Sequence, residues 1–159
     1  MIGDDTHAYR RDLPHLEKDG KTYFVTFCTR AREVLDFAER DLALEVCIRD
    51  HRVAYWLHCA VIMPDHAHLV FTTYEQYNLA TIMNRIKNVS AHAVTKKRGR
   101  SGSVWQREYF DRIVRAAEDL RQKCEYVCEN PARSGFPQDD RWIWRQWIDD
   151  APPRAAAPH

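Results

Sequence analysis

The stretch VAYWLHCAVIMPDHAHLVFTT, Val53–Thr73, decides the fold. Its first half, Val53–Met63, is a long apolar run, which predicts a central strand covered on both faces. Pro64 and Asp65 then favour a turn, because proline fixes its own φ and aspartate is a common turn residue. The second half, His66–Thr73, is expected to run back as the partner strand of a hairpin. This stretch therefore predicts the middle of an antiparallel sheet.

The flanking segments supply the other elements of the expected fold. Aromatic and β-branched residues predict strands, apolar residues three and four apart predict helices, and Pro131 is expected to stop the last helix. The expected elements are a strand at Lys21–Thr29, a helix at Phe37–His51 with Leu42, Leu44, Val46 and Ile48 inward, an amphipathic helix at Leu79–Lys96, a strand at Tyr109–Arg115 and a helix at Glu118–Pro131. The order is β-α-β-β-α-β plus a terminal helix. This order predicts an α+β fold, the ferredoxin-like split βαβ with an antiparallel sheet.

The length and composition indicate one globular domain. The chain has 159 residues, of which 45% are hydrophobic and 30% charged, as is usual for soluble domains. We expect a single domain over residues 1–147 and a disordered Pro/Ala-rich tail over residues 148–159. The five cysteines form no CxxC pair, which favours reduced thiols and a cytoplasmic protein. The sequence contains no apolar run long enough for a membrane span, and its start does not resemble a signal peptide.

Two histidines in the second strand of the hairpin form the first candidate site. Side chains alternate along a strand, so His66 and His68 share one face. Ala67, Leu69 and Phe71 point to the opposite face, and their apolar character suits a face covered by helices. Two imidazoles at this spacing can hold one metal ion between them. Taken alone, an HxH pattern more often means two half-exposed polar residues on a sheet than a metal site. A metal site would also need a third ligand.

The last helix offers that ligand and a nucleophile. Tyr126 and Asn130 are four residues apart, so on a helix they share a face. The amide oxygen of Asn130 can bind a hard cation, and the hydroxyl of Tyr126 can act as a nucleophile. Alternatively, Tyr126 is a boundary aromatic and Asn130 caps the helix before Pro131. The residues expected to face the core are Leu120, Cys124, Val127 and Cys128.

The charge distribution is uneven although the formal net charge is only +1. Residues 76–107 contain no Asp or Glu but several cations, including Arg85, Lys87, Lys96, Lys97, Arg98 and Arg100. Such a stripe is what a phosphate backbone requires. A solvated helix face and loop is the alternative, and it is the more common one for a charge run alone.

Four segments of the chain occur together in a known family. They are RRDLPHLEKDGKTYFVTF (10–27), MPDHAHLV (63–70), GSVWQREYFDRIVR (102–115) and EDLRQKCEYVCENPARSGF (118–136). In this combination the chain resembles the single-tyrosine HUH transposases, and most closely the REP-associated tyrosine transposases. The resemblance extends over roughly residues 8–147. The related insertion-sequence transposases usually have glutamine at the position of Asn130, whereas the REP-associated branch has asparagine.

The resemblance implies a mechanism. His66, His68 and Asn130 would hold Mg²⁺ or Mn²⁺, and Tyr126 would attack a phosphorus of single-stranded DNA. The products would be a 5′-phosphotyrosine and a free 3′-hydroxyl. His66, His68 and Tyr126 are then the expected catalytic residues of a DNA transposase that acts as a single-strand endonuclease.

The resemblance also implies DNA hairpins with unpaired bases at the foot as partners, and a monomer or homodimer. Residues 85–100 would grip phosphates through Arg85, Lys87, Lys96, Lys97, Arg98 and Arg100. Trp105 would stack on an unpaired base or, with equal weight, pack at the end of the last strand. Arg10 and Arg11 are further candidate DNA contacts.

Two other functions stay open at this point. The first is a DNA-hairpin-binding protein that has lost catalysis. The second is a metal-dependent hydrolase of a small substrate on the same common fold. A hydrolase would need a carboxylate or cysteine beside the histidines, and the only nearby carboxylate in the sequence is Asp65.

Overall fold

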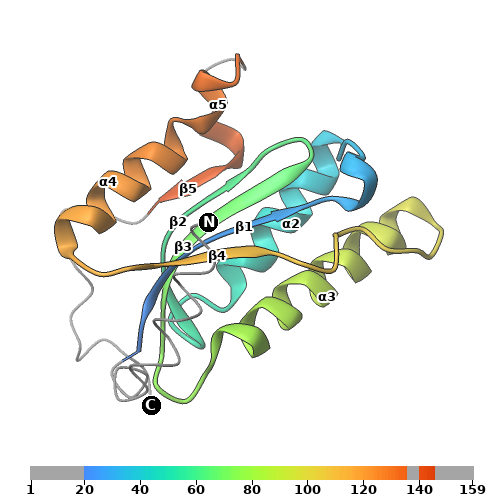
Figure 1. Cartoon of the computed structure of the whole chain (residues 1–159). Coiled ribbons are helices and arrows are strands. Elements are labelled where there is room, and N and C mark those ends of the chain that lie inside the picture. The colour runs from blue at the N-terminus through green and yellow to red at the C-terminus, as the bar shows by residue number, and fades with distance from the viewer. Residues whose placement is uncertain (1–19, 136–139, 146–159) are drawn as a thin grey trace.

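The hairpin predicted from the central stretch is present in the computed structural model of the chain, which describes residues 20–135 and 140–145 (Figure 1). Strand β2 (Tyr55–Ile62) is buried along its whole length, and β3 (His66–Thr73) runs back antiparallel to it. The backbone N–H of Met63 donates to the carbonyl of His66 at 2.7 Å and closes the turn. The double burial of β2 is what its continuous apolar sequence predicted.

The remaining strands extend this hairpin into a five-stranded antiparallel sheet. Strand β1 (Thr22–Cys28) pairs with β3, and β4 (Phe110–Val114) pairs with β1. The sheet order is β4-β1-β3-β2-β5. Its first four strands have the order of the split βαβ fold, so the predicted fold class is confirmed. The short β5 (Ile143–Arg145) pairs with β2 at the other edge, and the sequence analysis did not predict it.

One face of the sheet is covered by α2 (Phe37–Arg49) and α3 (Leu79–Arg98), which pack on Phe27, Leu69 and Phe71. Helix α2 begins with a capping box, in which Asp36 and Glu39 accept from each other's backbone N–H. Helix α3 begins at the cap Asn78 and ends at Gly99, which has a φ of 73°, a conformation that glycine adopts without strain. Two short 3₁₀ turns complete the layer, η2 (Arg30–Arg32) and η3 (Asp140–Trp142).

The predicted inward positions of α2 need a correction. Ala43, Val46 and Cys47 are buried, whereas Leu42 is only partly buried and lies outside the core cluster. Glu39 is also buried, because its carboxylate is engaged by Arg98 of α3. The helix is therefore turned so that a polar contact with α3 takes part of the inward face.

The opposite face of the sheet is covered by α4 (Ala117–Cys128), as Figure 1 shows. Its predicted core residues all pack inward, with Cys124, Val127 and Cys128 buried and Leu120 partly buried. They contact Phe24, Cys59, Val61 and Val70 of the sheet, among others. The face that carries His66 and His68 is thus the α4 face, as strand alternation predicted.

The end of α4 differs from the predicted single helix. Helix α4 stops at Cys128, and a second short helix, α5 (Asn130–Arg133), begins two residues later. Pro131 lies in the first turn of α5, where its missing N–H is not needed. Tyr126 and Asn130 therefore lie on successive helices rather than on one face of the same helix.

In the part of the chain that the structure describes, we find no helix with the length and apolar character of a membrane span. Arg10, Arg11 and the tail 148–159 lie outside the described residues.

Candidate active site

Strand β3 presents the two histidines to the α4 face with their rings close together. The ring centroids of His66 and His68 are 4.8 Å apart and the planes are inclined at 80°. The ring of His68 also stacks on Phe24 of β1, with centroids 5.6 Å apart. Neighbouring strands therefore position both imidazoles.

Each imidazole is held through the same nitrogen. The Nδ1 of His66 lies 2.8 Å from Oδ1 of Asp65, and the Nδ1 of His68 lies 2.8 Å from Oγ1 of Thr26. Because a carboxylate accepts, His66 donates through Nδ1, and Nε2 carries the free lone pair of the neutral ring. Among the described residues, neither Nε2 has a hydrogen-bond partner. Metal-binding histidines are commonly anchored in this way through the nitrogen that does not bind the ion.

The two anchors are themselves fixed. Thr26 of β1 lies directly opposite His68 in the strand register. Asp65 accepts from Arg32 at 3.1 Å, and its pKa is lowered by hydrogen bonds from Arg32 and His66 that outweigh its burial. Asp65 therefore stays ionised and orients the His66 ring, and it is engaged by two partners rather than free for other chemistry.

His68 is kept in its neutral form. Burial lowers its pKa to about 3, from an ordinary value of 6.5, and the nearby charges of His66, Arg133 and Lys123 act in the same direction. A neutral imidazole is the form that binds metal ions. The effect of Arg133 and Lys123 also indicates that the helices carrying Tyr126 and Asn130 lie close to His68.

Tyr126 projects from α4 with 53% of its surface exposed. The guanidinium of Arg133 lies 3.8 Å from the centre of the Tyr126 ring, and its NH1 donates to the Tyr126 carbonyl at 2.8 Å. Its NH2 donates to the Oδ1 of Asn130 at 3.1 Å. Arg133 thus couples Tyr126 and Asn130, although they belong to different helices.

Lys123 connects the tyrosine to the sheet. Its Nζ lies 5.2 Å from the centre of the Tyr126 ring and 4.6 Å from that of Phe24. Since Phe24 stacks on His68, a continuous series of contacts runs from the histidine pair through Phe24 and Lys123 to Tyr126. The predicted nucleophile and the predicted metal ligands therefore belong to one region of the α4 face.

The predicted donor set, two imidazoles and an amide, differs from the four Cys and His ligands of a structural zinc site. Within residues 20–135 and 140–145, no three side chains of His, Cys, Asp or Glu are grouped to hold a metal. The predicted third ligand, Asn130, is an amide, and its Oδ1 can share the Arg133 hydrogen bond because a carbonyl oxygen has two lone pairs. Two imidazoles and one amide oxygen leave coordination positions open for a substrate.

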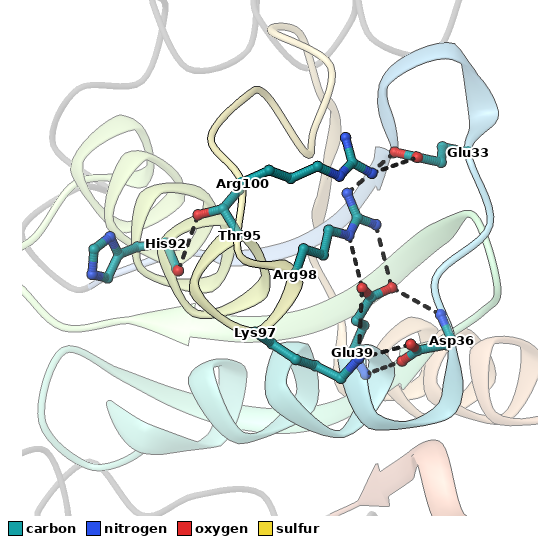
Figure 2. A network of polar contacts seen from close by, with 8 residues as sticks. All are labelled: Glu33, Asp36, Glu39, His92, Thr95, Lys97, Arg98 and Arg100. Carbon is teal, nitrogen blue, oxygen red and sulfur yellow. Dashed lines mark hydrogen bonds and ion pairs between the residues drawn. The ribbon is translucent and has the colours of Figure 1, made fainter.

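The predicted basic stripe has a different environment from the expected one. Figure 2 shows that acidic residues near the start of α2 meet the end of α3. Lys97 pairs with Asp36 at 2.8 Å, Arg98 with Glu39 at 2.7 Å, and Arg100 with Glu33 at 3.5 Å. Arg85 pairs with Asp50, and Lys87 donates to the carbonyl of Arg107. Only Lys96 of the six predicted phosphate contacts is exposed without a partner in the described structure.

Trp105 packs in the core. It is only 6% exposed, its indole N–H donates to Ser90 at 2.8 Å, and its ring meets Phe27 with centroids 4.7 Å apart. A base cannot reach a ring in this position, so the packing alternative holds and the stacking role is wrong for this arrangement.

Three cations of the α4 face were missed by the sequence analysis. They are Arg112 of β4, Lys123 of α4 and Arg133 of α5. The available signal was spacing, because Lys123 stands three residues before Tyr126 and therefore on the same side of the helix.

Comparisons with known proteins agree with this fold. The sequence profile of the "Transposase IS200 like" family matches residues 19–130. A curated relative, the REP-associated tyrosine transposase of Escherichia coli (strain K12), is 26% identical over 77 residues, which is 48% of this chain and 44% of that protein. The match thus spans less than half of the curated relative.

Two solved structures are similar in fold. A REP-associated tyrosine transposase bound to a REP hairpin superposes with a TM-score of 0.63 at 24% identity, over 75% of this chain and 71% of that one. A bacterial tRNA(His) guanylyltransferase-like protein in complex with GTP has a TM-score of 0.51 at 10% identity, over 86% and 78% of the chains. The second likeness shows how widely the fold is used.

The fold defines an α+β protein whose sheet has the split βαβ order with an additional edge strand. Because the family profile extends from before β1 to Asn130, the chain belongs to the IS200-like transposase family. The resemblance to REP-associated tyrosine transposases that the sequence motifs indicated is confirmed.

Proposed function

We propose that this protein nicks single-stranded DNA at hairpins and rejoins the strands, with Tyr126 as the nucleophile. One observation carries the proposal within the family: contacts through Lys123 and Phe24 connect an exposed tyrosine to two imidazoles that are both anchored through Nδ1. In the proposed mechanism, Tyr126 is the nucleophile and the two imidazoles help to hold a phosphate-activating cation. The hairpin substrate is proposed because a REP-associated relative of similar fold was solved with a REP hairpin.

The chemistry is a transfer between two phosphate esters. The Oη of Tyr126 forms a bond to phosphorus while the bond from phosphorus to the 3′ oxygen breaks. The tyrosine loses its proton, and the departing 3′ oxygen becomes a hydroxyl. Since one phosphate ester replaces another, the reverse step can rejoin strands without another energy source.

His66, His68 and Asn130 are the residues that would hold the Mg²⁺ or Mn²⁺ ion, and the ion would polarise the phosphate and offset its developing charge. Asp65 and Thr26 fix the two rings, and burial keeps His68 neutral. Arg133 holds the backbone of Tyr126 and the side chain of Asn130 in a fixed relation.

A covalent adduct tests the nucleophile. Single-stranded DNA hairpins of the REP type are incubated with the protein and Mn²⁺, and adducts are resolved on a denaturing gel. We expect wild type and Tyr109→Phe to form the adduct and Tyr126→Phe to form none, with DNA binding retained. Tyr109 is the matched control because it is the other tyrosine near the predicted DNA-contacting segment.

The same assay tests the cation. We expect EDTA and the double variant His66→Ala/His68→Ala each to reduce adduct formation at least a hundredfold, because the ion would polarise the phosphate and offset the charge that develops on it. Adduct formation that persists in EDTA would overturn the metal-dependent mechanism. An adduct that persists in Tyr126→Phe would assign the nucleophile elsewhere. Hairpin binding without any adduct in wild type would identify a non-catalytic binder.

A further inference from the structure

The cations on the two faces of the sheet differ in their partners. On the α3 side, Lys97, Arg98 and Arg100 are neutralised by acidic residues near α2. On the α4 side, Arg112, Lys123 and Arg133 form no ion pair in the described part of the chain. Among the described residues, cations without an ion pair therefore lie around Tyr126 as well as on α3, where Lys87 and Lys96 form none.

Lys123 is partly buried and has no carboxylate partner in the described structure. Its Nζ lies between the rings of Phe24 and Tyr126. Burial lowers the pKa of Lys123, and the charge of Arg112 adds to the effect. Arg112 lies opposite Phe24 in the register of β4 and β1, and Lys123 contacts the ring of Phe24, so both cations lie near this residue.

The guanidinium of Arg133 has N–H groups that make no hydrogen bond in the described structure. A guanidinium carries five N–H groups in a planar fork, and the described structure uses one from NH1 and one from NH2. Its plane lies over the exposed ring of Tyr126. The remaining donors are therefore beside the phenol, where an incoming phosphate would have to be.

We propose that Lys123 and Arg133 form a pocket that binds one DNA phosphate against Tyr126, with Arg112 adding long-range attraction. The proposal rests on the function proposed above, because it places the reacting phosphate at this tyrosine. Both cations lie close to the Tyr126 ring, Lys123 at 5.2 Å and Arg133 at 3.8 Å from its centre, so a phosphate that contacts both would lie beside this tyrosine. Arginine supplies a directional fork and lysine a compact point charge, the two usual means of binding phosphate.

Arg133 has a second role in this arrangement. Without DNA, its bonds to the Tyr126 carbonyl and to Asn130 hold α4 and α5 together across the break at Glu129. When a phosphate binds, the same guanidinium connects substrate, nucleophile and Asn130. Arg133 is thus a positioning residue as well as a phosphate contact.

A chemical double-mutant cycle tests the pocket by binding alone. Adduct mapping with wild type identifies the scissile phosphate, and a second hairpin carries an uncharged methylphosphonate there. Binding of both hairpins is measured without metal in the Tyr126→Phe background, alone and combined with Lys123→Met, Arg133→Gln or Lys96→Met. We expect the Tyr126→Phe protein to prefer the charged hairpin by about tenfold or more, the effect of one charge-assisted hydrogen bond.

Lys123→Met and Arg133→Gln should each remove most of that preference, and Lys123→Arg should restore it. Lys96→Met, which removes the same charge from the other side of the molecule, should weaken both hairpins equally. A purely structural role for Lys123 or Arg133 would also change both hairpins equally and would overturn the pocket. With tyrosine in place, both pocket variants should slow adduct formation at least tenfold.

These experiments distinguish a failure of the proposed function from a failure of the proposed phosphate pocket. If wild type forms no adduct on any hairpin, the proposed function is overturned, and the pocket for a reacting phosphate falls with it. If wild type forms the adduct but the pocket variants keep the preference for the charged hairpin, only the pocket is overturned.

Discussion

At the scale of single residues, buried imidazoles act as neutral groups in this fold. His58 of β2 is buried, and its Nε2 lies 2.8 Å from the hydroxyl of Thr72, which in turn bonds to Thr22 at 2.6 Å. Burial lowers the pKa of His58 to about 4, with a smaller contribution from His51. Below pH 6.5 the unfolded chain would therefore bind a proton at His58, whereas the folded protein keeps His58 neutral.

This difference predicts how stability depends on pH. As the pH falls from about 6.5 to about 4, the unfolded state takes up a proton at His58 and the folded state does not, so the free energy of unfolding decreases. Between pH 7 and pH 4.5 the loss from this residue should be on the order of 2–3 kcal/mol. His58→Gln, which keeps a hydrogen-bonding group but has no titration, should lose that much less in urea denaturation over the same range.

Comparing how the free energy of unfolding changes with pH in wild type and in His58→Gln isolates the effect of His58, since His68 and the carboxylates titrate in both proteins. Identical pH dependence in wild type and His58→Gln would mean that His58 is protonated in the folded state.

At the scale of elements, the end of α3 is joined to the start of α2 by the contacts in Figure 2. Arg98 donates to both oxygens of Glu39, at 2.7 and 3.2 Å, and their side chains are only 10% and 6% exposed. The Arg98 bond lowers the pKa of Glu39 more than burial raises it. Glu39 also caps α2, so one carboxylate supports a helix start and a contact between helices.

Removal of Arg98 should therefore destabilise the protein. Arg98→Leu leaves the buried charge of Glu39 without its main partner, and we expect a loss of about 2–4 kcal/mol in chemical denaturation. The double variant Arg98→Leu/Glu39→Gln should recover much of the loss, because Gln keeps the capping oxygen without the charge. Arg100→Leu is the matched control, and its exposed contact with Glu33 should contribute less than about 1 kcal/mol. Equal losses in Arg98→Leu and Arg100→Leu would contradict this view of the contact.

The elements could be predicted to different extents, for physical reasons. Periodicity located the hairpin, α3 and the inward face of α4, because a helix or strand must bury a regular set of positions. The short β5 was missed because three residues carry too little pattern and form a strand only against the edge of β2. The break between α4 and α5 was misjudged because Pro131 can either stop one helix or begin the next.

The residues of the candidate site could also be predicted from the sequence to different extents. Alternation along β3 placed His66 and His68 on the correct face. The partners of Lys97 and Arg98 could not be predicted, since Asp36 and Glu39 lie about sixty residues away in the sequence and meet them only after α2 and α3 pack. Such ion pairs depend on tertiary structure and leave no local signal.

At the scale of the whole molecule, these ion pairs change where DNA is expected to bind. The formal net charge of the chain is +1, but among the described residues the α4 face keeps cations without partners, whereas much of the stripe on α3 is neutralised. We expect the cations beside Tyr126 to contribute most of the phosphate contacts, because the proposed phosphate pocket lies there.

Salt dependence of hairpin binding tests this distribution. The triple variant Arg112→Gln/Lys123→Gln/Arg133→Gln should reduce the slope of log affinity against log salt by about 2, at 0.7–0.9 for each lost phosphate contact. A variant that neutralises Lys96 and Arg100 should reduce it by less than about 1. A larger effect from Lys96 and Arg100 would indicate that DNA binds along the α3 stripe and would contradict this prediction.

The order of elements along the chain has a consequence for when this chemistry becomes possible. Both histidines are on β3, but the tyrosine is on α4, which follows β4 and packs on a face that β1, β2 and β3 must first create. A nascent chain that has emerged only as far as β3 holds the imidazoles without a nucleophile, and domains acquire such long-range packing late in folding. The same dependence persists in the finished protein. Local opening of α4, visible as hydrogen exchange of its amides at a lower free energy than those of β2 and β3, would withdraw the tyrosine while the sheet stays folded.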